Sequence, residues 1–286
     1  MTTHADPVPR IPLSDSVAIP QVGFGTFQIP PDATQEAVES ALAMGYRHID
    51  TAAAYYNEAG VGAAIRASGI PRDVIFVTTK LRNGDQGYES GLKAFDHSLG
   101  QLGLDRVDLY LLHWPVPTKD QYLETWRAIE KVKADGGARA IGVCNFLPAH
   151  LERLLANCAD RPVINQIELH PTLQQRDAAA ASVDAGLVVE AYSPLGQGGD
   201  LRTDVVTRIA EAKGVTPGQV VLRWHVDAGR VVIPKSVTPE RQRANIDLFG
   251  FDLTDDERAQ VDSLEAGTRV CPDPNTFEAP QDPKKR

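Results

Sequence analysis

The strongest constraint on the fold is a regular alternation of short apolar segments with longer amphipathic ones along most of the chain. Strands separated by helices pair in parallel through right-handed crossovers. Eight such units over about 250 residues predict an α/β fold of the closed (β/α)8 TIM-barrel type rather than a doubly wound sheet. The expected strands are residues 22–25, 46–50, 75–80, 107–113, 139–144, 163–168, 187–192 and 231–234.

A helical segment is expected after each strand. Thr34 is predicted to cap the first helix, Gly45 to stop it in a left-handed conformation, and Pro148, Pro217 and Pro239 to occupy first-turn positions. The expected helices are residues 34–44, 61–67, 89–101, 121–134, 148–157, 174–184, 203–213 with 217–226, and 239–248.

The two ends of the chain fall outside this alternation. Residues 11–19 are expected to form a β-hairpin across the bottom of the barrel, and residues 267–286 an extra loop over an opening. No shift in composition and no flexible linker divides the chain. We therefore predict a single domain, residues 1–286.

Composition limits the classes of partner. A net charge of −9 disfavours nucleic acid, which requires a basic face. The three cysteines form no CxxC pair, and no apolar run approaches the roughly 18 residues of a membrane-spanning helix. The N-terminus lacks the apolar core of a signal peptide. We therefore expect a monomer in the cytoplasm that binds a small molecule, with no membrane or nucleic-acid partner and no metal.

Four polar residues are predicted to form the active site. Asp50, Lys80 and His113 end three expected strands, and Tyr55 follows the first of these by a short loop. Active sites of parallel barrels lie at the carboxyl ends of the strands. An ammonium from Lys80 would lower the pKa of Tyr55, while Asp50 would keep that ammonium charged. With a ring N–H from His113, the four residues could polarise and protonate a carbonyl as hydride arrives.

Hydride requires a cofactor, because no side chain donates it. A Rossmann motif is weakly supported, since Gln28 takes the place of the third glycine after Gly23 and Gly25. A phosphate site is better supported at residues 233–243, where a strand end precedes a helix N-terminus and three cations. The glycine-rich residues 196–199 follow the preceding strand, and barrels commonly bind phosphate between these two loops.

Several ordered motifs make the chain resemble the bacterial aldo-keto reductases, including their diketogluconate and methylglyoxal reductases. The matching stretches extend through nearly all of the chain: Gly45-Tyr-Arg-His-Ile-Asp50-Thr-Ala, Tyr56-Asn-Glu, Thr79-Lys80-Leu81, Asp108-Leu-Tyr-Leu-Leu-His113-Trp-Pro115, Ile141-Gly-Val-Cys-Asn145-Phe, Asn165-Gln166, Ala191-Tyr-Ser-Pro-Leu-Gly196 and Ile233-Pro-Lys-Ser236.

The resemblance implies an NADPH-dependent oxidoreductase that reduces aldehydes and ketones, including dicarbonyls and keto-sugars, with Tyr55 as the acid. It also implies a cofactor site. Tyr192 would stack on the nicotinamide, Asn145 and Gln166 would bind its carboxamide, and Ser193, Leu195 and Gln197 would border the pyrophosphate. The adenosine 2′-phosphate would lie at Lys235, Ser236, Val237, Arg241 and Asn245. Gly25 and Thr26 complete the predicted cofactor site, and Phe27, Arg82 and Trp114 the substrate pocket.

Three positions depart from the family pattern. Cys144 replaces a serine beside the carboxamide, and Ala244 replaces an acidic residue near adenine. Arg82 stands where many relatives have tryptophan, which predicts a cation in the pocket and a preference for substrates with a carboxylate.

Three other functions fit some of these residues. His48, Asp50, His113 and His170 could be the ligands of a metal-dependent hydrolase, although the basic groups at the mouth disfavour a cation. Lys80 could form a Schiff base in a lyase, although Asp50 would hold the amine protonated. A cofactor-sensing subunit without turnover is the third possibility.

Overall fold

The structure is a computed structural model that describes residues 8–278. Its main sheet has eight parallel strands in the order β10-β9-β8-β7-β6-β5-β4-β3. The prediction of eight parallel strands is thus confirmed. Their bounds are β3 (Phe24–Gly25), β4 (His48–Asp50), β5 (Phe76–Leu81), β6 (Val107–Leu112), β7 (Ala138–Cys144), β8 (Ile164–Glu168), β9 (Val188–Tyr192) and β10 (Val231–Val232).

Backbone hydrogen bonds between the first and last strands close the sheet into a barrel. The N–H of Gly23 donates to Val232 O over 2.8 Å, and the N–H of Val232 donates to Gln21 O over 2.9 Å. A Cβ on Gly25 would lie 2.7 Å from Ile233 O, so this seam admits only glycine there. The closed (β/α)8 barrel is therefore the observed fold.

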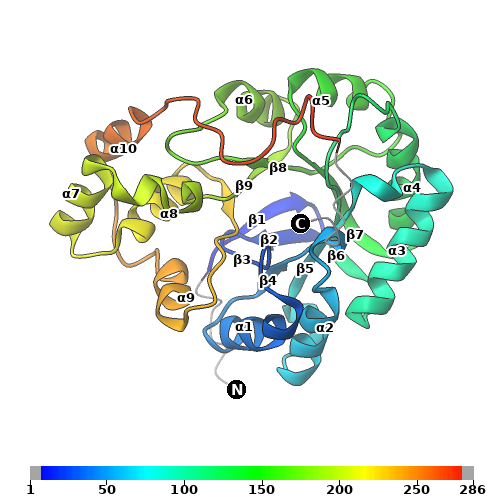
Figure 1. Cartoon of the computed structure of the whole chain (residues 1–286), viewed down its shortest axis with the longest axis horizontal. Coiled ribbons are helices and arrows are strands. Elements are labelled where there is room, and N and C mark those ends of the chain that lie inside the picture. The colour runs from blue at the N-terminus through cyan, green and yellow to red at the C-terminus, as the bar shows by residue number, and fades with distance from the viewer. Residues whose placement is uncertain (1–7, 279–286) are drawn as a thin grey trace.

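Helices surround the barrel (Figure 1). They are α1 (Pro31–Ala43), α2 (Glu58–Ala67), α3 (Tyr88–Leu102), α4 (Tyr122–Ala134), α5 (Pro148–Leu155), α6 (Arg176–Asp184), α7 (Asp204–Lys213), α8 (Pro217–Asp227), α9 (Pro239–Ile246) and α10 (Asp255–Asp262). Short 3-10 helices lie in the connections: η1 (Ala53–Tyr55), η2 (Arg72–Val74), η3 (Asn83–Asp85), η4 (Gly196–Gly198) and η5 (Asp200–Arg202).

The predicted helix ends were mostly right. Pro148, Pro217 and Pro239 are the first residues of their helices, and Gly45 has a φ of 104° just beyond α1. Thr34 is not the N-cap of α1, because Pro30 and Pro31 start that helix earlier, and the Thr34 hydroxyl donates to Pro30 O. Helix α10 was not predicted, although Thr254 and Glu257 form a capping box at its start.

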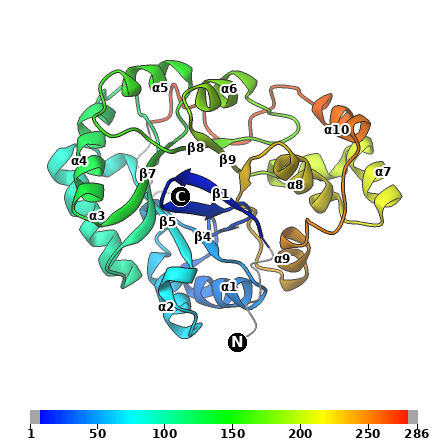
Figure 2. The same ribbon diagram turned by 180° about the vertical axis from the view of Figure 1, so that it is seen from behind.

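The N-terminal hairpin covers one end of the barrel (Figure 2), as predicted. Strands β1 (Arg10–Ser14) and β2 (Val17–Pro20) pair antiparallel. Val17 and Ile19 pack on inward-facing apolar side chains of the barrel, which come from alternate strand positions such as Phe76, Leu109 and Leu111. The inward positions farther along the same strands are polar, so the apolar plug lies beneath a polar layer.

Residues 267–278, which we call the C-terminal segment, run from α10 past α6 and α5 on the side away from the hairpin (Figures 1 and 2). They contain no helix or strand, in agreement with the predicted loop. The remainder of that loop prediction, 279–286, lies outside the described residues. None of the helices in residues 8–278 is both long and apolar enough to span a bilayer.

Candidate active site

The four predicted catalytic residues meet at the barrel mouth opposite the hairpin. Asp50 ends β4 and Lys80 lies in β5, so both side chains project inward from neighbouring parallel strands. Lys80 Nζ lies 2.5 Å from Asp50 Oδ1 and 3.1 Å from Thr51 O. The Asp50 and Lys80 side chains are buried, so each ion requires its partner.

Tyr55 completes this group from η1, where a single helical turn after β4 brings it over the strand ends. Its hydroxyl is 3.4 Å from Lys80 Nζ. The Tyr55 ring lies 5.1 Å from the ring of Phe27 and 5.7 Å from that of His113. The phenol is therefore held between the ammonium and two aromatic rings.

The protonation states differ in one respect from the prediction. Burial lowers the pKa of Lys80, but the negative charge of Asp50 outweighs this and raises it above its usual range. Burial also raises the pKa of Tyr55 above its usual range and outweighs the opposing effect of Lys80. The expected lowering was wrong for this state, because burial of the phenol outweighs the charge of Lys80, and the charge of Asp50 adds to the effect of burial. Tyr55 thus keeps its proton, and Lys80 is too firmly protonated for Schiff-base chemistry.

His113 directly follows β6 and is a neutral imidazole. Burial, followed by the charge of Lys80, holds the pKa of His113 well below its usual range. Its Nδ1 is buried without a hydrogen-bond partner among the described residues, while its main-chain oxygen accepts a bond from Asn145. A neutral imidazole can offer one N–H to a carbonyl oxygen but is a poor acid.

A second carboxyl, Glu190, lies beneath the Asp50–Lys80 pair and was not predicted. The Gln166 amide donates to Asp50 over 2.9 Å and to Glu190 over 2.8 Å. Burial, with the charge of Asp50, raises the pKa of Glu190 to about 8. Glu190 therefore holds its proton more readily than a free carboxyl does, which limits the negative charge beside the Asp50–Lys80 pair.

The ligand set of the hydrolase alternative is not assembled. His48, Asp50 and Glu190 do lie together, with ligand atoms within 4.8 Å of one another. However, Asp50 is paired with Lys80, and His48 Nε2 already lies 3.1 Å from Thr78 Oγ1. His170, the proposed fourth ligand, uses both ring nitrogens on Asp200 and Glu168. A competing ammonium at the centre of this group disfavours a metal ion.

The residues expected around the nicotinamide are adjacent. The Tyr192 hydroxyl donates to Asn145 Oδ1 over 2.7 Å, and Asn145 has a φ of 65°. Cys144 Sγ lies 3.6 Å from Gln166 Oε1 and 3.2 Å from Asn145 Nδ2. The thiol that replaces the family serine is therefore a weak partner of both amides.

The predicted 2′-phosphate site lies at the start of α9. Lys235, Val237 and Arg241 are exposed, whereas Ser236 and Asn245 are buried. Neither Lys235 nor Arg241 has a side-chain hydrogen bond or ion pair within residues 8–278. The N-terminus of α9 also has no side-chain cap. Unpaired cations beside free helix N–H groups form a suitable site for a phosphate.

The predicted pyrophosphate residues lie in the β9–α7 loop, residues 193–203. Ser193 and Gln197 have φ values of 46° and 51°, a left-handed backbone that is unusual for residues other than glycine. Leu195 is partly buried against the core. Cys271 of the C-terminal segment lies over this loop, with its Sγ 3.9 Å from Ser193 Oγ and 3.8 Å from Gln197 Nε2.

Two of the predicted pocket residues form an aromatic wall, and the third differs from the prediction. Phe27 lies beside Tyr55, and Trp114 packs on Phe277 at 4.5 Å between ring centroids. The Arg82 guanidinium donates to both oxygens of Asp85 and to the Tyr56 hydroxyl. The expected cation is therefore paired with a carboxylate three residues away, which weakens the basis of the predicted attraction for acidic substrates.

Gly25 and Thr26, the remaining predicted cofactor residues, lie at the barrel seam. The Thr26 hydroxyl donates to Asp50 O over 3.0 Å, and Asn57 donates to Thr26 O over 2.9 Å. Thr26 thus fixes the backbone that carries Asp50.

The sequence predicted a C-terminal loop over an opening but did not identify which of its residues contribute to the mouth. Cys271 and Phe277 carry no motif, and their positions depend on a buried anchor formed by Glu168. The resemblance offered no indication of this anchor.

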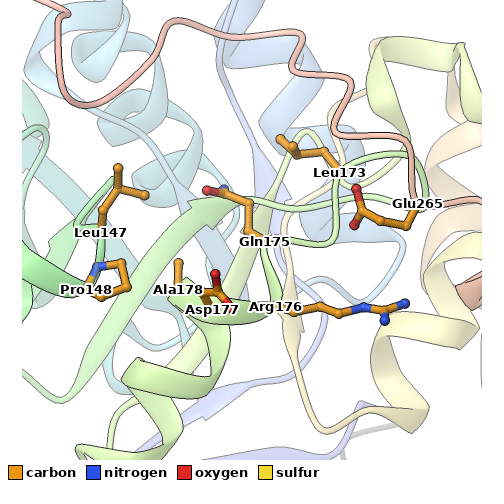
Figure 3. A pocket seen from close by; sticks show the side chains of 8 residues that line it. All are labelled: Leu147, Pro148, Leu173, Gln175, Arg176, Asp177, Ala178 and Glu265. Carbon is orange, nitrogen blue, oxygen red and sulfur yellow. The ribbon is translucent and has the colours of Figure 1, made fainter.

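A separate cavity of about 470 Å³ lies outside the catalytic group. Figure 3 shows Gln175 at its centre, with Leu147 and Pro148 on one side and Leu173 and Glu265 on the other. The C-terminal segment passes above it in this view. None of the predicted site residues lines it.

Comparisons with known proteins agree with this geometry. A sequence model of the Aldo/keto reductase family matches residues 21–266. An aldo-keto reductase of Mycolicibacterium smegmatis is 51% identical over 94% of this chain and 98% of its own. Morphine 6-dehydrogenase of Pseudomonas putida is 50% identical, with 93% and 94% covered, and the methylglyoxal reductase DkgA of Yersinia pestis is 46% identical, with 94% and 97% covered.

Solved structures show the same fold. An aldo/keto reductase from Brucella melitensis superposes with a TM-score of 0.88 at 51% identity, covering 90% of this chain and 98% of its own. A mutant of Gox0644 in complex with NADPH superposes with a TM-score of 0.90 at 42% identity, covering 94% and 98%.

Proposed function

Because the chain belongs to the aldo-keto reductase family, we propose that it reduces aldehydes and ketones to alcohols with NADPH and that Tyr55 supplies the proton. The observation that carries this proposal is the position of Lys80 Nζ, which contacts both Asp50 and the Tyr55 hydroxyl. This contact places a protonated phenol at the mouth of the barrel beside a neutral His113.

The residues present are suited to NADPH. Lys235 and Arg241, which have no side-chain partner within residues 8–278, offer positive charge beside the N-terminus of α9, as a 2′-phosphate requires. Tyr192 ends β9 and Asn145 directly follows β7, so both lie between the proposed phosphate site and the catalytic group. Bound NADPH would supply the hydride that no side chain can donate.

The chain's own residues would bind and protonate the carbonyl. The N–H of His113 would orient the carbonyl oxygen, and the Tyr55 hydroxyl would transfer its proton to that oxygen as negative charge develops on it. The Lys80 ammonium would stabilise the phenolate that remains. Phe27, Trp114 and Phe277 would exclude water from the reacting carbonyl.

Small neutral dicarbonyls are the substrates that we propose. The aromatic wall offers apolar contact, and Arg82 is already paired with Asp85, so the described pocket residues provide no free cation for a carboxylate. The similarity to a methylglyoxal reductase supports the same class. Oxidation of NADPH should therefore be faster with methylglyoxal than with a diketo-sugar acid; a clear preference for the acid would overturn this assignment.

Tyr55→Phe tests the proton donor. We expect the variant to bind NADPH as the wild type does but to lose about 10²–10⁴-fold in kcat, the usual contribution of a general acid. Tyr88→Phe, on the outer helix α3, is the matched control and should retain full activity. Near-normal turnover of Tyr55→Phe would refute the acid role, and a wild type that binds NADPH without turnover would favour a cofactor-sensing function.

A further inference from the structure

A buried network of three side chains joins two parts of the barrel mouth that are far apart in the sequence. His170, two residues beyond β8, has its Nδ1 2.9 Å from Asp200 Oδ2 and its Nε2 3.2 Å from Glu168 Oε1. All three residues are almost fully buried. The Thr172 hydroxyl donates to the other oxygen of Asp200 over 2.7 Å.

On one side, Glu168 anchors the C-terminal segment. Its carboxylate accepts the N–H of Val270 over 2.6 Å and that of Cys271 over 3.2 Å, and it lies 3.3 Å from the guanidinium of Arg269. This anchor fixes where the segment crosses the mouth. It thereby places Phe277 against Trp114 in the proposed substrate pocket.

On the other side, Asp200 anchors the β9–α7 loop. It begins η5, and its carboxylate lies so close to Gly196 that a Cβ there would come within 2.5 Å of Oδ2. The same loop carries Ser193 and Gln197, which touch Cys271 of the C-terminal segment. The loop and the segment therefore meet twice, once through Cys271 and once through His170.

A protonated His170 is needed to hold both anchors at once. Burial lowers the pKa of His170, but hydrogen bonds and charges from Asp200 and Glu168 outweigh it and raise the pKa to about 9. The other groups near it are Arg269, which contacts Glu168, and His225, which burial keeps neutral. The imidazolium donates from both nitrogens, whereas a neutral ring could donate to only one carboxylate.

We propose that His170 is a positioning residue that couples cofactor binding at the β9–α7 loop to the position of the C-terminal segment that walls the substrate pocket. This inference rests on the proposed function. Cofactor bound against Ser193 and Gln197 would further stabilise the loop, and through Asp200, His170 and Glu168 it would stabilise the segment in its observed position. Reciprocity requires that loosening the segment weaken cofactor binding in turn.

A double-mutant cycle tests the coupling. Arg269→Ala loosens the segment at a residue of the anchor, and His170→Gln removes the cationic bridge. We expect each single variant to raise the Kd of NADPH and the KM of methylglyoxal by about fivefold or more while changing kcat less than about twofold. In the His170→Gln background, Arg269→Ala should raise the Kd of NADPH less than about twofold further. Additive effects of the two substitutions would overturn the proposal.

The reactivity of Cys271 gives a readout that a merely structural role would not change. In a Cys158→Ser background, iodoacetamide labelling located by mass spectrometry reports on Cys271, because Cys144 is buried. We expect NADP to slow the labelling in the wild-type network and to slow it much less after His170→Gln. Equal protection in both proteins would also overturn the proposal.

Controls separate the possible failures. His97→Gln, on the exposed face of α3, should leave the Kd of NADPH, the KM of methylglyoxal and the labelling unchanged. If His170→Gln does not fold, Asp200→Asn replaces it in the same cycle with the same criteria, since it keeps the side-chain shape and removes one charge. A wild type that does not bind NADPH would refute the proposed function itself; binding and reduction with additive variants would refute only the coupling.

Discussion

The catalytic group and the proposed phosphate site both lie at the barrel mouth, but they differ in burial and in whether their charges are paired. Asp50 and Lys80 are buried and paired, with the hydroxyl of the partly buried Tyr55 close to Lys80, whereas Lys235 and Arg241 are exposed and have no partner among the described residues. A buried charge needs a partner within the protein even when no ligand is bound. An exposed cation needs none, because water solvates it. The catalytic ion pair is therefore formed when the chain folds, whereas the cations of the phosphate site gain a counter-charge only when the cofactor binds.

The comparison predicts that the catalytic pair matters for stability as well as activity. Lys80→Met should lower the free energy of unfolding by about 3–5 kcal/mol, because it leaves the buried carboxylate of Asp50 unpaired. Lys80→Met with Asp50→Asn should recover most of that loss, since no charge then remains. Thermal or denaturant unfolding measures both; an unstable double variant would mean that Lys80 acts through packing rather than charge.

At the exposed end the prediction is reversed. Arg241→Ala should leave stability within about 0.5 kcal/mol of the wild type, as an unpaired surface residue allows. It should weaken NADPH binding by about tenfold through loss of a charge-assisted contact and leave NADH binding nearly unchanged. Titration of both cofactors at low and high salt measures this. Equal losses for the two cofactors would contradict the 2′-phosphate assignment.

The same contrast explains what could be read from the sequence. Asp50, Lys80 and His113 were found because each lies at or beside the end of a buried strand, and the register of a parallel barrel brings such residues together. The exposed cations were found because they cluster beside a helix start. In both regions local sequence carries the information, since position along a strand or helix decides where the side chain points.

The failures have a different physical origin. The state of Tyr55 depends on how burial weighs against a paired ammonium, and the environment of Arg82 depends on the turn that brings Asp85 to it. The roles of Glu190 and His170 depend on their hydrogen-bond partners on other strands and loops. These environments depend on how the folded chain places the partners, including Asp85 only three residues from Arg82, and the strand and helix patterns of the sequence do not give that placement.

Arg82→Ala is expected to have the smallest effect of these substitutions. Its site is intermediate between the buried catalytic pair and the exposed phosphate site. Arg82 is partly exposed, yet it is paired with Asp85 before any ligand binds, as Lys80 is with Asp50. Because its ion pair lies at the surface, we expect that pair to contribute little to stability. We expect kcat/KM to fall less than about threefold, and equally for methylglyoxal and for a diketo-sugar acid, because the guanidinium serves Asp85 rather than substrate. Asp85→Asn is the matched control: it frees the guanidinium and should selectively improve kcat/KM for the acid. A selective fall in kcat/KM for the acid in Arg82→Ala would instead show that Arg82 leaves Asp85 to bind a substrate carboxylate. The pairing of a charged residue before ligand binding would then not predict whether that residue binds substrate.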